Sequence, residues 1–226
     1  MRVKLDDNFS FTQDGHKYNL CDLPEGFTIK GDVYLSHKDV GKLPDLSKVF
    51  VEGNFACRGA LLYTLKGAPK KVSGNFDCGF NELGSLEGAP QEVGGDFNCS
   101  GNDLESLEGA PKKVSGDFDC SENSGLISLC QVTPDCNIIH CDEKLAQQYG
   151  LKGSDIAYKE LKESPVFQKE KEQQEKIESQ KGHLQERQEY LAERKGEKVL
   201  SPTEPTTHDS TSSAPSKPNG RDDGGR

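Results

Sequence analysis

The feature that most constrains this chain is a 21-residue period between residues 53 and 141. Each copy opens with Gly-x-Phe-x-Cys, at residues 53, 74, 95 and 116. A fixed period in the twenties is typical of a solenoid, in which each copy forms one coil that cannot bury its apolar side alone. The repeat therefore predicts a stack of coils.

Residues at the same phase of successive copies form columns. The Phe and Cys columns are two residues apart, which is the period of a strand, so we expect both to face inward. Stacked copies would then build a parallel sheet with rungs roughly 4.7–4.9 Å apart. The Phe column, which ends on Ile, the Cys column, two Leu columns and a Val column are Phe55, Phe76, Phe97, Phe118 and Ile139; Cys57, Cys78, Cys99, Cys120 and Cys141; Leu62, Leu83 and Leu104; Leu65, Leu86 and Leu107; and Val51, Val72, Val93 and Val114.

Two polar features recur between these columns. Asn81, Asn102 and Asn123 follow the Cys residues by three positions. An inward Asn at the end of a short strand can bond the backbone of its own turn and of the next coil, because buried backbone groups need partners. Gly-Ala-Pro, as at 67–69 and 88–90, predicts the return turn, since Gly permits an unusual φ and Pro ends any helix.

The run Cys78-x-x-Asn81-x-Leu83-x-x-Leu86 after Phe76 resembles the leucine-rich-repeat pattern, with Cys at an inward position often held by Leu. The short period and the Pro-containing return resemble the compact bacterial and bacteriophage versions of that family. The pattern departs from the family at Ala60, in the Asn column, and around Gly125, where it slips by a residue. The resemblance implies a protein that binds other proteins through the exposed positions of its concave sheet.

We therefore expect residues 31–141 to form a short right-handed α/β-type solenoid of about five coils, with a parallel sheet on one side and mostly irregular return segments. Residues 31–52 are a degenerate first copy, in which Val33 and Leu35 replace Phe and Cys. Residues 1–30 are expected to cap this end of the stack, since terminal copies face solvent on one side.

The chain after residue 141 predicts helices and then disorder. Residues 142–163 are expected to form a helical C-terminal cap, with Asp142 and Ser154 as helix N-caps. Residues 164–196 are rich in Glu, Gln, Lys and Arg and predict a charged, solvent-exposed helix. Residues 197–226 are Ser, Thr, Pro, Gly and Asp, which is typical of a disordered tail.

The charged helix also carries a weak coiled-coil signal. Ile177, Leu184 and Leu191 are seven residues apart. The second apolar position of the heptad is missing and Gly182 interrupts the pattern, so the sequence favours a solvated helix and leaves the oligomeric state open.

Composition excludes several functional classes. The formal net charge is −10, which disfavours direct binding of nucleic acid or of an anionic membrane. No apolar run has signal-peptide or transmembrane character, so we expect a cytoplasmic protein. The five His residues form no catalytic motif and the Gly residues follow the repeat, not a phosphate-binding loop. The sequence predicts a non-enzyme without cofactors.

The eight cysteines allow three interpretations. Neighbouring rungs hold Cβ atoms about 4.8 Å apart, which is longer than the Cβ–Cβ distance of roughly 3.5–4.5 Å in a disulfide. The Cys column is therefore expected to be buried free thiols in a reducing compartment. The alternative is a zinc site at Cys130, Cys136, His140 and Cys141. That set lacks a Cys-x-x-Cys pair, and Cys141 already belongs to the Cys column, so the sequence disfavours a metal.

Residues flanking the inward Phe and Cys must point outward from the sheet. The outward residues with charge or a large ring are the candidate partner-binding set, Asp32, Tyr34, Asp77, Phe80, Asp96, Asp117, Asp119 and Glu122, with Arg58 as the only positive charge among them. Nothing in the repeat pattern requires acidic residues there, and like charges on adjacent rungs are unfavourable. They could merely keep the sheet soluble. They could also capture a basic protein surface, with an aromatic residue as an anchor.

Three functions follow from this reading. The first is non-enzymatic protein binding through the acidic strand face in a bacterial or phage intracellular setting, the host cytoplasm for a phage protein. The alternative is an acidic decoy that occupies the nucleic-acid site of a DNA- or RNA-binding enzyme. The third is a zinc-stabilised structural module.

Overall fold

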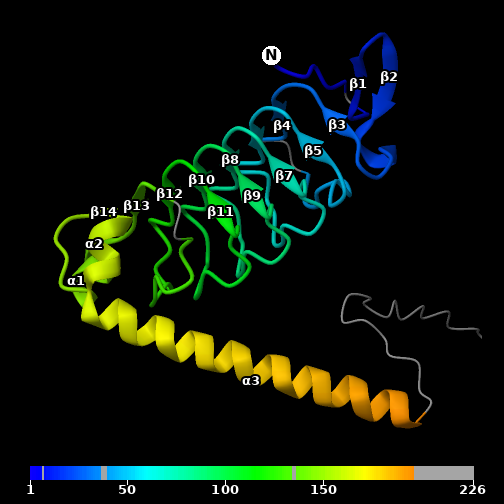
Figure 1. The fold of residues 1–226 in the computed structure, drawn as a ribbon. Helices are drawn as coiled ribbons and strands as arrows, with labels where there is room; N and C mark the ends of the chain where they lie inside the picture. Colours follow the sequence, from blue (N-terminus) through cyan, green and yellow to red (C-terminus); the bar gives the residue numbers. More distant parts are fainter. Residues whose placement is uncertain (7, 37–39, 134–135, 196–226) are drawn as a thin grey trace, which may run out of the picture. The chain divides into compact units, whose positions relative to one another are not determined.

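The computed structural model describes residues 1–6, 8–36, 40–133 and 136–195. It shows a parallel-strand solenoid of about five turns followed by helices (Figure 1). The chain forms two compact units, Met1–Glu178 and Ser179–Arg226, and the solenoid lies in the first. The predicted disordered tail, 197–226, lies outside the described residues. In the described part, no helix is both long and apolar enough to cross a membrane.

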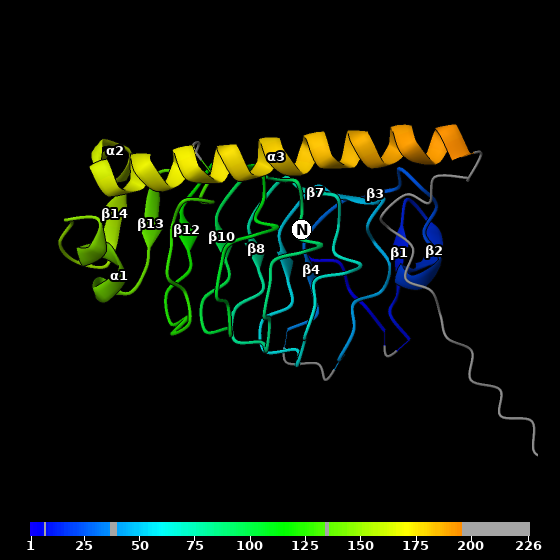
Figure 2. The same ribbon diagram turned by 90° about the horizontal axis from the view of Figure 1, so that it is seen from below.

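The Phe-x-Cys strands stack into one sheet, and the register of the pairs preserves the columns. Phe97 pairs with Phe76 on one side and with Phe118 on the other, all in parallel. The degenerate first copy joins the stack, because Val33 pairs with Phe55. From one end to the other, as Figure 2 shows, the strands are β4 (Val33–Tyr34), β6 (Phe55–Ala56), β8 (Phe76–Asp77), β10 (Phe97–Asn98), β12 (Phe118–Asp119), β13 (Ile138–His140) and β14 (Asp155–Ala157).

A second parallel sheet lines the other side of the coils, so the expectation of one sheet was incomplete. Its strands carry the Val column: β3 (Thr28–Ile29), β5 (Phe50–Val51), β7 (Lys71–Val72), β9 (Glu92–Val93) and β11 (Lys113–Val114). Each strand is two residues long, with the second residue buried and the first partly or fully exposed, as Val72 and Lys71 are. The repeat shows one inward column here, Val, without a second inward column two residues away, so no strand period can be recognised in the sequence.

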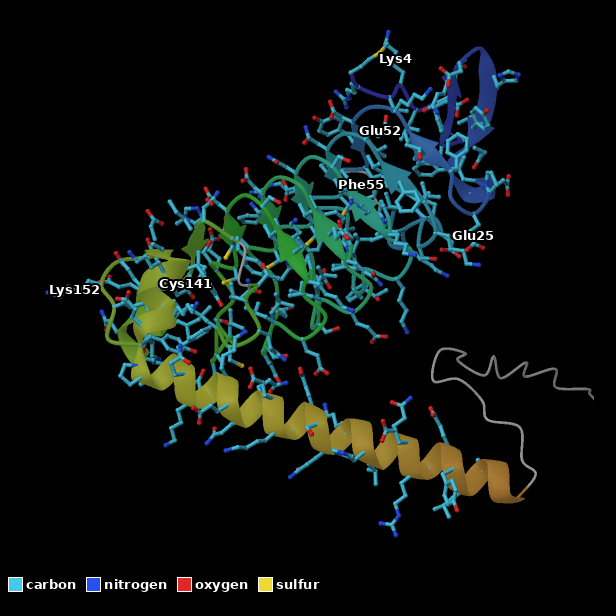
Figure 3. The ribbon with its side chains drawn as sticks, in the orientation of Figure 1. Lys4, Glu25, Glu52, Phe55, Cys141 and Lys152 are labelled. Atoms are coloured by element: carbon cyan, nitrogen blue, oxygen red, sulfur yellow. The ribbon has the colours of Figure 1, made fainter. Side chains whose placement is uncertain are left out.

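The interior between the two sheets is filled by the predicted columns. The rings of Phe55 and Phe76 are stacked with centroids 5.5 Å apart, and those of Phe76 and Phe97 are 5.7 Å apart. Phe55 and Cys141, labelled in Figure 3, are both fully buried. All eight cysteines are free thiols. Burial raises the pKa of the Cys78 thiol well above its ordinary value, so this column is packing material and not a reactive site.

The Asn column bridges consecutive coils, as its inward position predicted. Asn102 accepts a hydrogen bond from the backbone N–H of Leu83 at 3.1 Å. Its amide donates to the carbonyls of Cys78 at 3.2 Å, in the preceding coil, and of Cys99 at 2.9 Å, in its own. One side chain thus satisfies buried backbone groups on two rungs, which fixes the spacing of the stack.

The N-terminal end of the stack is covered by β1 (Ser10–Gln13) and β2 (His16–Asn19), an antiparallel hairpin followed by the short helix η1 (Leu20–Asp22). The side chain of Gln13 donates to the carbonyl of Thr28 at 2.9 Å and accepts from the N–H of Lys30 at 2.7 Å. These bonds occupy backbone groups on the open edge of β3, which would otherwise offer a template for another strand.

The C-terminal end contains a strand where the sequence predicted a helix. Ser154 does not begin a helix, because Asp155–Ala157 forms β14, which pairs antiparallel with β13 and places Ile156 opposite Ile139. The helices are α1 (Glu143–Gln148) and α2 (Tyr158–Glu163). Asp142 precedes α1, but its carboxylate accepts from the N–H of Glu122 at 3.0 Å instead of capping the helix. Closing the sheet edge outweighs the local capping preference.

The long helix α3 (Pro165–Lys195) is anchored at its first turns. Phe167 is 1% exposed and packs edge-on against the rings of Tyr149 and Tyr158. The hydroxyl of Tyr149 donates to Glu170 at 2.8 Å. The expectation of a solvent-exposed helix is therefore wrong for its first turns, where Phe167 is buried. Further along the helix, Ile177, Leu184 and Leu191 are exposed.

Candidate functional site

The outward side of the seven-stranded sheet, which we call the strand face, holds the residues that the sequence singled out. We number its rungs 1 to 6 from β4 to β13, and the positions of each rung from the Gly that opens the copy. One column of outward residues lies on each side of the inward Phe column. The second-position column is Asp32, Asn54, Asn75, Asp96, Asp117 and Ile138, and the fourth-position column is Tyr34, Ala56, Asp77, Asn98, Asp119 and His140.

The second-position column forms a ladder of hydrogen bonds that climbs the stack. Asp96 accepts from the backbone N–H of Asp117 at 2.9 Å, and Asn75 accepts from that of Asp96 at 3.0 Å. Asn54 accepts from Asn75 at 2.7 Å, and Asp32 accepts from Asn54 at 2.9 Å. Each side-chain oxygen therefore satisfies a backbone donor one rung further along.

The fourth-position column makes a different, local bond. Asp77 accepts from the N–H of Gly79 at 3.0 Å and Asp119 from that of Ser121 at 3.0 Å, so each closes an Asx turn at the end of its strand. Asn98 makes the same bond to Ser100 at 2.9 Å. These side chains are held in one orientation with one oxygen occupied.

These bonds add a requirement that the sequence did not reveal, although they agree with the expectation that the repeat does not require acidic residues there. An acceptor is required at both positions, and it holds the rungs in register. The negative charge is not required, because Asn54 and Asn75 serve the ladder, and Asn98 the turn, with a neutral amide. The backbone hydrogen bonds of the fold therefore do not require the charges of Asp77, Asp96, Asp117 and Asp119, although the second oxygen of Asp96 also accepts from Asn75 Nδ2 at 3.1 Å.

The aromatic members of the face are each stacked against an arginine. The guanidinium of Arg58 lies 3.9 Å from the centroid of the Phe80 ring, and that of Arg2 lies 4.6 Å from the centroid of Tyr34. Phe80 is 42% exposed. Within the described residues no ion pair of Arg58 is present. The face is thus divided: the arginine–aromatic pairs involve the rings on rungs 1 and 3, and four of the six acidic candidates lie on rungs 4 and 5.

The seventh position has a left-handed backbone on rungs 2 to 5, the four regular copies of the repeat. Gly59 and Gly101 take φ of 59° and 64°, while Phe80 and Glu122 take 54° and 55°. Glycine adopts this conformation without cost, whereas a residue with a Cβ is strained by roughly 1–2 kcal/mol. Phe80 and Glu122 therefore place side chains on the strand face at an expense to stability, and strain of this kind concentrates at functional positions.

His140 lies at the acidic end of the face. Its Nδ1 is 2.8 Å from Asp155 Oδ1 on β14, and its Nε2 is 3.8 Å from Asp117 Oδ2 on the preceding rung. Burial lowers the pKa of His140, but the hydrogen bond with Asp155 and the charges of Asp119, Asp155 and Asp117 together raise it above its ordinary value. His140 therefore couples the last rung to the strand that covers it.

The residues weighed as a zinc site have other partners. His140 points outward to Asp155, while Cys141 is buried in the Cys column. The thiol of Cys136 donates to the carbonyl of Thr133 at 3.2 Å. In the parts of the chain that the structure places, no group of three or more His, Cys, Asp or Glu residues is arranged to hold a metal ion.

Sequence reasoning placed the eight candidate residues on one side of the coils, and the structure brings them onto the strand face. Sequence reasoning missed Arg2, because the N-terminal segment precedes the repeat. It also missed the pairing of His140 with Asp155, which depends on a strand where a helix was expected. The strain at Phe80 and Glu122 had a visible signal, since Gly59 and Gly101 hold the same position in other copies.

Comparisons with known proteins add no name to this site. No protein-family model, curated protein or solved structure matches the chain. The functional argument therefore rests on the chain's own geometry.

Proposed function

We propose that this protein is a non-enzymatic interaction module, of the compact leucine-rich-repeat type found in bacteria and phages, that binds a protein with a basic surface through its strand face. The setting we propose is the bacterial cytoplasm. The observation that supports this function is the surplus charge. The face needs acceptors at its second and fourth positions, and Asp occupies five of these positions although Asn would serve the same backbone bonds.

The fixed geometry of these carboxylates favours binding over mere solubility. Their Oδ1 atoms are held by backbone N–H groups, as at Asp77 and Asp119, so little side-chain entropy remains to be lost when a partner binds. Rungs about 4.8 Å apart make the charges an ordered array. Such an array steers a cationic partner to the face, and the half-exposed ring of Phe80 offers an apolar contact beside it.

The test replaces charge and keeps the acceptor. In the variant Asp77→Asn, Asp96→Asn, Asp117→Asn and Asp119→Asn, the ladder and the turns can still form while four charges are lost. Tagged wild type and variant are compared by capture from a bacterial lysate at low salt, with bound proteins quantified by mass spectrometry. We expect basic proteins captured by the wild type to be lost from the variant. If those proteins are nucleic-acid enzymes, the decoy function is favoured over a general adaptor.

A matched control removes four charges elsewhere. Glu82, Glu87, Asp103 and Glu105 lie in the exposed return segments of the coils, and changing them to Gln or Asn gives the same net charge as the test variant. This control should capture the same proteins as the wild type. Equal loss in both variants would show a non-specific effect of net charge, and capture that survives in the test variant would exclude the strand face as the binding site.

A further inference from the structure

Three large apolar side chains are exposed where the coils of rungs 2 and 3 turn from strand into return segment. Leu61 is 49% exposed, Tyr63 is 68% exposed and Phe80 is 42% exposed. The same positions of neighbouring coils hold polar residues or Gly, namely Glu82 and Asp103, Gly84 and Glu105, and Gly59 and Gly101. The repeat therefore requires an apolar residue at none of the three positions.

Contacts between the two coils place these side chains close together. The N–H of Gly59, two residues before Leu61, donates to the carbonyl of the residue before Phe80 at 3.0 Å. The hydroxyl of Tyr63 is hydrogen-bonded to the side chain of Glu82, two residues after Phe80, and this bond raises the pKa of Tyr63. We call Leu61, Tyr63 and Phe80 the corner patch.

Two members of the corner patch are exposed in a backbone conformation that strains them. Leu61 takes φ of 56° and Phe80 takes φ of 54°, both in the left-handed region. Glu82 and Asp103, at the position of Leu61 in the next two coils, do not have a positive φ. Each of the two apolar side chains thus reaches solvent at a cost to stability that glycine would avoid, and such strain concentrates at functional positions.

The ring of Phe80 is fixed by neighbours on two sides. The guanidinium of Arg58 lies 3.9 Å from its centroid, and ring atoms lie 3.1 Å from the place that a Cβ of Gly101 would take. A side chain at Gly101 would therefore displace the ring. A ring that is held in place and still partly exposed is preorganised for an apolar contact, since little conformational freedom is lost on binding.

Charge changes sign along the strand face beside the corner patch. On this face rung 2 has no acidic residue and carries Arg58, while rungs 3 to 5 carry Asp77, Asp96, Asp117, Asp119 and Glu122. Rungs 4 and 5 lie roughly 5 and 10 Å from rung 3, which holds Phe80. A cationic group is therefore repelled from rung 2 and attracted to rungs 4 and 5.

We propose that the strand face and the corner patch together bind one cationic amphipathic segment of a partner protein. An apolar side chain of the segment packs on the corner patch, and Lys or Arg residues lie on rungs 4 and 5. This binding mode deepens the proposed function and rests on it, because the acidic rungs are the same. Aromatic residues and Arg, which are enriched in protein interfaces, form the apolar end of the site. The two ends are roughly 10 Å apart, a distance that three extended residues span.

A tryptophan-containing peptide is a direct probe, because the chain itself contains no Trp. The probe is Trp-Gly-Lys-Gly-Lys-Gly-Lys, and its fluorescence is titrated with the full chain at low salt. One control peptide has Ser in place of Trp and is measured by competition; another has Glu in place of each Lys. We expect the probe to bind, the Ser peptide to bind about tenfold more weakly and the Glu peptide not to bind.

The corner variant, Leu61→Asn with Tyr63→Ser and Phe80→Gly, removes the patch and keeps the net charge. Asn and Gly suit the left-handed backbone at the first and last of these positions. The affinity of the variant for the probe should fall about tenfold, to that of the Ser peptide for the wild type. Urea unfolding verifies that the solenoid is intact.

A matched control removes three exposed apolar side chains elsewhere. Ile127→Asn, Ile177→Gln and Leu184→Gln are combined, since all three side chains are exposed and none belongs to the corner patch. This variant should bind the probe as the wild type does, and a tenfold loss here would show that the probe responds to surface hydrophobicity in general, which would overturn the proposal.

Three further outcomes would overturn the proposal: a wild type that does not bind the probe, a Ser peptide that binds as well as the probe, or a corner variant of wild-type affinity. The variant with Asn at residues 77, 96, 117 and 119 separates this result from the proposed function. If that variant loses the Lys peptides while Trp makes no difference, the proposed function stands and the corner patch is excluded. If that variant keeps the Lys peptides at wild-type affinity, the proposed function fails, and the binding mode fails with it.

Discussion

Successive residues of one strand serve two different regions of the molecule. Phe97 is fully buried between the rings of Phe76 and Phe118, while Asp96 and Asn98 on either side of it lie on the strand face. The inner region repeats the same residue type, because each ring must fit the rings above and below it. The outer region repeats a function, a hydrogen-bond acceptor, and accepts Asp or Asn for it. The residue types of the inner columns are therefore set by the fold, whereas the choice between Asp and Asn in the outer columns is not.

Truncation inside the stack should have the largest effect. Phe97→Ala removes a ring with neighbours on both sides, and we expect a loss of about 3–5 kcal/mol in the free energy of unfolding. Val33→Ala in the first rung should cost less, since a smaller side chain is lost beside a solvent-facing cap. Urea unfolding of the two variants measures the difference, and equal losses would argue against a continuous stacked core.

The same substitution, Asn to Ala, can be made in the buried Asn column and in the exposed second-position column, which sharpens the comparison. Asn102→Ala leaves a buried N–H and buried carbonyls without partners, for a loss of about 2–3 kcal/mol. Asn75→Ala leaves groups that water can reach, since Asn75 is exposed, and should cost about 1 kcal/mol or less. Thermal unfolding of both variants should therefore differ clearly, and similar shifts in melting temperature would show that inner and outer ladders carry equal weight.

Relief of strain on the strand face should raise stability slightly. Glu122→Gly places the residue that fits φ of 55°, and we expect a gain of about 0.5–1 kcal/mol after the greater chain entropy of Gly is taken into account. Glu122→Ala keeps the Cβ and hence the strain, so it should give no such gain. Differential scanning calorimetry of the pair measures this, and a destabilised Glu122→Gly would remove the evidence that the side chain is held there against the preference of the backbone.

The smallest effect should be a pH dependence at the C-terminal end. Because the folded-state pKa of His140 is raised, its protonated form stabilises the fold below the unfolded pKa near 6.5, and this contribution is lost as pH rises through the folded value. Asp155, Asp117 and Asp119 are the carboxylates that face it. Unfolding between pH 6 and 8 should show a decrease in stability that His140→Gln abolishes; an identical decrease in the variant would assign it to other groups.

The inner columns could be predicted from the sequence because they repeat, and repetition reveals the period, the stacking and the burial of Phe97 and Cys99 together. The second sheet could not, because Val93 and its equivalents form a single inward column, without the second column two residues away that marks the Phe-x-Cys strands. The strand at Asp155–Ala157 could not, because it forms only where β13 offers an open edge. On the strand face, sequence identified which residues point outward, but only the structure shows that Asp96 and Asp117 are structural acceptors whose charge is a separate matter.

That separation of acceptor from charge is the central claim, and urea unfolding of two matched variants tests it most directly. Both change Asp77, Asp96, Asp117 and Asp119, one to Asn and the other to Ala. The Asn variant should keep the wild-type free energy of unfolding within about 1 kcal/mol, since every backbone N–H keeps its acceptor and the exposed bond from Asn75 Nδ2 to Asp96 Oδ2 is the hydrogen bond that an amide cannot replace. The Ala variant should lose several kcal/mol, at roughly 1 kcal/mol for each lost acceptor. An Asn variant as unstable as the Ala variant would contradict the account, because the charges would then belong to the fold and would no longer indicate a partner.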